Sequence, residues 1–187
     1  MTTTSFNLRE EILREHSKTH CLNMVAWIGT NQHRFNELLQ LVLSDEYRVA
    51  QRASWPLSEL AIVHPELFHS SLEVLIDTLE RRELHNAVRR HTMRILETVV
   101  IPVKLQGKVM KLCFEFVESP SEAVAVKAYA LTVLGKLAIA YPDIIPEIKL
   151  LIEEQLPTQT PAFKSRAKHL LKAFTRSKNS LVQNAHW

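Results

Sequence analysis

The stretch VRRHTMRILETV, residues 88–99, has apolar or small residues at its first, fifth, ninth and twelfth positions. The same pattern recurs in VAQRASWPLSEL at 49–60, VKAYALTVLGKL at 126–137 and FKSRAKHLLKAF at 163–174, at intervals of 39, 38 and 37 residues. Residues at these spacings share one face of an α-helix, so each copy predicts an amphipathic helix. Leu57, Leu96 and Leu134 should therefore be buried at equivalent places.

Prolines at 65, 102 and 142 each precede a further stretch with helical spacing of apolar residues. Proline suits the first turn of a helix, where its missing N–H would have no intrahelical partner. The chain thus predicts helix pairs, which we divide into A segments and B segments. The A segments are 32–43, 65–84, 103–118 and 142–156, and the B segments are 46–62, 86–100, 121–140 and 161–176. A helix pair that recurs every 37 to 40 residues indicates a solenoid.

The composition agrees with an all-α protein. The chain has 187 residues, of which 46% are hydrophobic and only 3 are glycine. The start shows no secretory leader, and no window approaches 18 consecutive apolar residues, so we expect a soluble, cytoplasmic protein without a membrane partner. Cys21 and Cys113 lie on apolar helix faces and are expected to be buried thiols, which fits a reducing compartment.

The repeats resemble HEAT repeats, within the wider armadillo-type class. The resemblance rests on PELFHSSLEVLIDTL at 65–79, AVRRH at 87–91 and VLGKLA at 133–138, although Val49 is followed by alanine where the pattern has a basic residue. It implies an α-α superhelix of about four to five helix pairs in a single domain, 1–187. Residues 1–30 read as a degenerate cap of two helices, 31–176 as the repeats and 177–187 as a polar tail.

The two segment families differ in charge. The B segments hold 12 Lys and Arg against 4 Asp and Glu, a net charge of +8, whereas the A segments hold 7 against 12, a net charge of −5. The resemblance to HEAT repeats implies that the second helix of each pair lines the concave side, so we expect a basic concave face. Guanidinium forks beside aromatic rings suit carboxylate or phosphate groups. The expected partner-binding residues are Arg52, Trp55, Arg90, Arg94, Tyr129, Arg166, His169, Lys172 and Arg176; Arg90 and Arg94 should both reach the groove.

We read the chain as a binding or scaffold module without catalysis, whose concave face holds an acidic protein segment. One alternative is a nucleic-acid-binding protein, because some alkylpurine DNA glycosylases resemble this architecture. In that case Glu97 would be the inward carboxylate, where the resemblance leads us to expect an aspartate. A purely structural subunit that assembles through its ends is a third possibility, and the oligomeric state is left open.

No stretch predicts a cofactor or a metal site. His16 and His20, with Cys21 adjacent, have a spacing seen at zinc sites, but no second ligand pair completes a tetrahedral set. Ser165 and Lys168 match a Ser-x-x-Lys pattern without the companion motifs of the enzymes that use it. Gly-rich phosphate-binding loops, HExxH and GxSxG are absent. Catalytic residues are therefore not expected.

Overall fold

The computed structural model describes the backbone of residues 6–81 and 83–183 and the side chains up to residue 176. These described residues form ten α-helices and three short 3-10 helices, and they contain no strand. The chain divides into two compact units, the first ending at Ile101 and the second beginning at Pro102.

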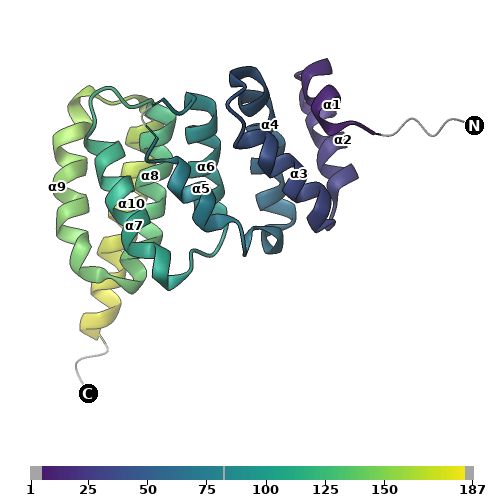
Figure 1. The fold of residues 1–187 in the computed structure, drawn as a ribbon. Coiled ribbons are helices and arrows are strands. Elements are labelled where there is room, and N and C mark those ends of the chain that lie inside the picture. Colours follow the sequence, from purple (N-terminus) through teal and green to yellow (C-terminus); the bar gives the residue numbers. More distant parts are fainter. Residues whose placement is uncertain (1–5, 82, 184–187) are drawn as a thin grey trace, which may run out of the picture. The chain divides into compact units, whose positions relative to one another are not determined.

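Unit 1 contains three helix pairs (Figure 1). In chain order its elements are α1 (Leu8–Arg14), α2 (Lys18–Ile28), α3 (Gln32–Val42), α4 (Tyr47–Val63), η1 (Pro65–Phe68), α5 (Leu72–Thr78) and α6 (Asn86–Thr98). The first three helices begin at side-chain caps, from Asn7, Ser17 and Asn31, whose oxygens accept backbone N–H groups that lack intrahelical partners. Gly29 ends α2 with a φ of 49°, a conformation that favours glycine.

The core of unit 1 is built around α4, which packs against α1, α2, α3 and α6. Leu57 on α4 and Leu96 on α6 are fully buried, as their repeat positions predict. Phe35 and Phe68 meet edge to face with ring centroids 4.9 Å apart, which ties α3 to η1. The two buried stripes on α4 and α6 therefore meet within one continuous core.

Unit 2 contains two helix pairs, α7 (Val103–Glu118) with α8 (Val124–Ala140), and α9 (Ile145–Gln155) with α10 (Pro161–Gln183). The short turns η2 (Pro142–Ile144) and η3 (Leu156–Thr158) flank α9. α8 packs against α7, α9 and α10, and Leu134 in its centre is fully buried. Figure 1 labels these helices and shows α10 in yellow at its C-terminal end.

The predicted fold class is confirmed: the chain is all-α and consists of repeated helix pairs. Two boundaries differ from expectation. The predicted A helix at 65–84 is split into η1 and the short α5, where residues 69–71 interrupt it and the Ser71 hydroxyl donates to the Phe68 carbonyl at 3.4 Å. The polar tail expected from 177 is helical as far as Gln183, because α10 continues; residues 184–187 lie outside the described part.

Cys21 and Cys113 are buried free thiols, as predicted. Burial raises the pKa of both thiols, that of Cys21 to about 12, so neither is a thiolate near neutral pH. Across the described residues, no helix combines the length and apolarity needed to cross a membrane.

Candidate functional site

The predicted binding residues divide between the two units. Unit 1 carries Arg52, Trp55, Arg90 and Arg94, and unit 2 carries Tyr129, Arg166, His169, Lys172 and Arg176.

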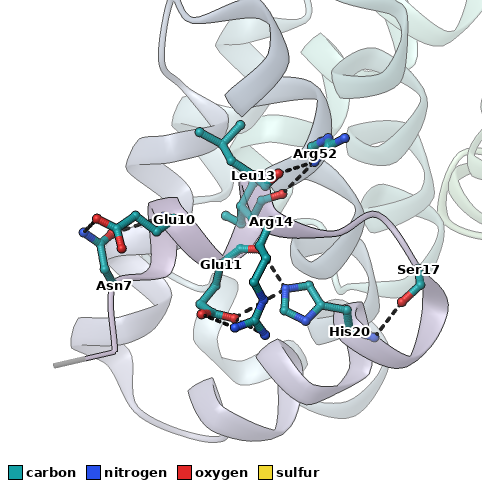
Figure 2. Close-up of polar contacts among 9 residues, drawn as sticks. Asn7, Glu10, Glu11, Leu13, Arg14, Ser17, His20 and Arg52 are labelled. Atoms are coloured by element: carbon teal, nitrogen blue, oxygen red, sulfur yellow. Dashed lines mark hydrogen bonds and ion pairs between the residues drawn. The ribbon is translucent and has the colours of Figure 1, made fainter. Parts of the chain in front are cut away.

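Arg52 projects from α4 onto the C-terminal end of α1. Its Nη1 donates to the carbonyl of Leu13 at 2.7 Å and lies 3.4 Å from that of Ile12 (Figure 2). The last carbonyls of a helix lack intrahelical partners and form the negative end of its dipole, so a cation stabilises them. Arg52 therefore fastens the first helix pair to the second, a structural role that sequence reasoning did not foresee.

A carboxylate on α4 joins Trp55 to α6. The indole Nε1 of Trp55 donates to Glu59 Oε1 at 3.0 Å, and Arg94 Nη1 donates to the same oxygen at 2.8 Å. Burial opposes ionisation of Glu59, but the hydrogen bonds from Arg94 and Trp55 outweigh it and lower the pKa of this carboxyl. The pair is about three-quarters shielded from solvent, with side chains 25% and 22% exposed for Arg94 and Glu59.

His91 on α6 is buried beside this pair. The Ser58 hydroxyl donates to the Trp55 carbonyl at 2.9 Å, so His91 Nδ1, 2.8 Å from Ser58 Oγ, is the donor of that contact. Nε2 is then an acceptor, and Arg90 Nη2 lies 3.1 Å from it. Burial, followed by the charges of Arg90 and Arg94, lowers the pKa of His91 to about 3. The imidazole is therefore neutral and links α4 to α6.

These contacts define the surroundings of the predicted binding residues in unit 1. Arg94, which was expected to reach the groove, is half-buried and ion-paired to Glu59 of α4. Arg90 is exposed, and its guanidinium also reaches His91. Trp55 is half-buried, and its ring lies 5.2 Å from that of His16 in an edge-on arrangement. Glu97 is half-buried on α6.

In unit 2, Arg166 is held across the contact between α10 and α8. Its Nη1 donates to Thr132 Oγ1 at 2.7 Å, and its guanidinium carbon lies 4.8 Å from the centroid of the Tyr129 ring. A guanidinium over an aromatic face gains a cation–π attraction. The structure thus brings Arg166 and Tyr129 together and holds the guanidinium in one orientation.

The other cations of α10 up to residue 176 lie on its exposed surface. Lys164, Lys168, His169, Lys172 and Arg176 are all solvent-exposed. Most are spaced by four residues and therefore lie along one side of the helix. No Asp or Glu follows Glu154 in the sequence, so α10 has no carboxylate of its own to offset this charge.

The two histidines considered as metal ligands make different contacts. His16 precedes α2, whereas His20 lies within it and is buried, with Nε2 2.7 Å from the Glu11 carbonyl (Figure 2). Among the residues with described positions, no cluster of three or more His, Cys, Asp or Glu side chains is arranged to hold a metal ion. Ser165 and Lys168 both lie on the exposed surface of α10.

Sequence reasoning missed the roles of Ser58 and Glu59, which organise the polar contact between α4 and α6. Ser58 is a polar residue and is fully buried. The role of Ser58 becomes apparent only from its hydrogen-bond partner His91, which is 33 residues away in the sequence. No local pattern contains that information.

Comparison with curated proteins and with solved structures finds no match. A family model described as a HEAT repeat domain matches residues 8–174, a range that covers α1 to α9 completely and α10 as far as residue 174. The match agrees with the helix pairs found in each unit. The chain belongs to the HEAT-repeat family, whose domains serve as scaffolds for protein interactions.

Proposed function

We propose that this chain is a non-enzymatic binding module in which α10 of unit 2 holds an acidic segment of a partner protein. The observation that carries the proposal is the exposed row of cations on α10 without any acidic residue on that helix. Like charges four residues apart destabilise a helix by a few tenths of a kcal/mol per pair. An anionic partner removes that repulsion, so binding and helix stability are coupled.

The length of the row indicates the size of the segment. Lys164 and Arg176 are twelve residues apart, which corresponds to about 18 Å along a helix axis. An extended peptide covers this distance with about five residues. A short run of Asp and Glu in a protein partner therefore matches the row in length and in charge.

Arg166 supports the same proposal. Its guanidinium is oriented by Thr132 and by the Tyr129 ring, so its orientation is set before a ligand arrives. Pre-organised side chains lose less conformational entropy on binding. In unit 1 the arginines Arg52 and Arg94 hold the helices together, so we assign them a structural role there and retain only Arg90 as a candidate contact.

We place the protein in the cytoplasm, because two buried free thiols fit a reducing compartment. Nucleic acid is the alternative partner for the same cations. It predicts affinity that falls steeply with salt, with a log–log slope of about −0.9 per contacted phosphate on duplex DNA. The alkylpurine DNA glycosylase form of this alternative needs Glu97, and it predicts base release that is lost in Glu97→Gln.

The proposal is tested by selecting from a random peptide display library on the full chain. Enrichment of Asp- and Glu-rich peptides is expected, and it should disappear when the target is the Lys168→Glu, Lys172→Glu double variant. The matched control reverses Lys104 and Lys108 on α7, in the same unit, and should keep the enrichment. Selected peptides without acidic bias, or acidic peptides that bind the Lys168→Glu, Lys172→Glu variant equally well, would refute the proposal.

A further inference from the structure

A cavity of about 780 Å³ lies in unit 2 between the C-terminal half of α8, the start of α9 and α10. Its lining is mostly apolar and includes Ile139, Pro146, Leu170 and Phe174. The volume lies in the range of sites that bury a ligand of small-molecule size. Neither the repeat pattern nor the family match assigns a role to it.

Gly135 and Leu170, which both line the cavity, lie in close contact. A Cβ added to Gly135 would lie 2.4 Å from Leu170 Cδ1, so the absence of a side chain on α8 lets the leucine of α10 lie against it. One turn further along α8, Ile139 is 86% exposed although it is a large apolar side chain at the cavity wall. Covering such a side chain removes apolar surface from water and is favourable.

The charged groups around the cavity indicate what covers it. Lys149 of α9 is the single charged side chain among the described lining residues, and it is half-buried. On α10, the wall residue Ala173 lies three residues before Arg176, the last member of the exposed cationic row, and residues at this spacing are neighbours on a helix surface. The apolar wall and the cationic row therefore adjoin on one helix. An occupant with an apolar group flanked by negative charge is complementary to both.

We propose that the cavity receives one large apolar side chain from the same acidic segment that α10 binds. This inference rests on the proposed function and specifies it further: the partner motif is a leucine- or phenylalanine-sized residue flanked by Asp or Glu. The apolar residue supplies buried area in a defined place, whereas the acidic residues supply charge. Such central apolar anchors with a polar surround are typical of protein interfaces.

The test uses two fluorescein-labelled peptides of ten residues, composed of Asp and Glu with one central leucine or one central alanine. Fluorescence anisotropy should show that the leucine peptide binds the full chain about tenfold more tightly. Ala173→Phe, which fills the cavity from an exposed position, should abolish this difference while leaving affinity for the alanine peptide. Ala162→Phe, exposed on the same helix and outside the cavity, is the matched control and should preserve the difference.

A second variant, Ile139→Ser, removes the apolar side chain of an exposed wall residue. With it, the test of the cavity does not depend only on whether Ala173→Phe folds. Ile139→Ser should also lower the preference for leucine. If both peptides bind the parent chain equally, and both lose affinity in the Lys168→Glu, Lys172→Glu variant, the cavity inference is wrong and the proposed function stands. If neither peptide binds, the proposed function itself fails. A leucine preference that survives both cavity variants, or a dimer of this chain that either variant dissociates, would also overturn the inference.

Discussion

Acidification should destabilise unit 1 through His91, because the folded chain holds this imidazole neutral. Burial and then the charges of Arg90 and Arg94 lower its pKa from 6.5 to about 3. Between these pH values the unfolded chain binds one more proton than the folded chain, so the free energy of unfolding rises with pH by about 1.4 kcal/mol per unit. This contribution is complete above pH 6.5 and is lost as the pH falls toward 3. At pH 5.0 the chain should be about 2 kcal/mol less stable than at pH 7.5 from this group alone.

Urea denaturation at pH 5.0, 6.0 and 7.5 measures the effect. In a Trp187→Phe background, Trp27 and Trp55 remain as fluorescence reporters, and both lie in unit 1. His91→Asn removes the titrating group while keeping an N–H donor near Ser58, and the exposed His33→Asn is its control. The pH dependence should shrink by about 2 kcal/mol over this range in His91→Asn and stay unchanged in the control.

The comparison isolates His91 from its neighbours. His16 and Glu59 also face it, but the lowered pKa of the Glu59 carboxyl places its titration below this pH range. Burial lowers the pKa of His85 as well, and this contribution is common to both proteins and cancels in the difference. Equal pH slopes for the parent and His91→Asn would refute the account of a buried neutral histidine.

Three further results are expected. Leu134→Ala should cost about 2–5 kcal/mol in urea denaturation because it leaves a cavity in the core of unit 2, whereas Leu150→Ala, at a side chain 57% exposed, should change stability by about 0.5 kcal/mol or less; equal effects would contradict the assigned burial. Arg52→Met should weaken the attachment of α1 by about 1–2 kcal/mol, seen as faster amide hydrogen exchange in α1, and unchanged exchange would contradict the hydrogen bonds to its C-terminal carbonyls. Cys21 and Cys113 should react with a thiol reagent only at the rate of unfolding, and fast labelling of the native chain would be inconsistent with their burial.

Most of the fold followed from helical periodicity and from proline. Leu57, Leu96 and Leu134 each belong to the apolar stripe of their own helix, and such a stripe can be recognised from a short stretch of sequence. A helix with one apolar face must bury that face against a neighbouring helix. The predicted α7 agrees with the structure at both ends, 103 and 118. Segment 65–84 was mispredicted because its apolar spacing continues through Ser70 and Ser71, where the helix is interrupted. The periodicity of apolar residues identifies the buried face of a helix. It does not reveal where a serine hydroxyl hydrogen-bonds to a backbone carbonyl and interrupts the helix.

The candidate site was less predictable, since it depends on pairs of residues far apart in the sequence. The charge of α10 can be counted from the sequence. In the structure, Lys168 and Lys172 of this helix are exposed. The ion pair between Arg94 and Glu59, which is 35 residues earlier, depends on how α4 and α6 are positioned along each other's axes. The cavity beside Gly135 likewise brings together residues from α8, α9 and α10. Such contacts arise from the packing of helices and leave no pattern in the local sequence.

The most direct test of the central claim is an anisotropy titration of the full chain with an acidic peptide and, in parallel, with a labelled DNA duplex, over a series of salt concentrations. We predict that the peptide binds, and that Lys168→Glu with Lys172→Glu weakens its affinity on the order of tenfold while Lys104→Glu with Lys108→Glu does not. Duplex DNA should bind more weakly than the peptide at every salt concentration. Peptide affinity that is unchanged in the Lys168→Glu, Lys172→Glu variant, or duplex binding that is tighter and falls steeply with salt, would contradict the claim that α10 holds an acidic protein segment.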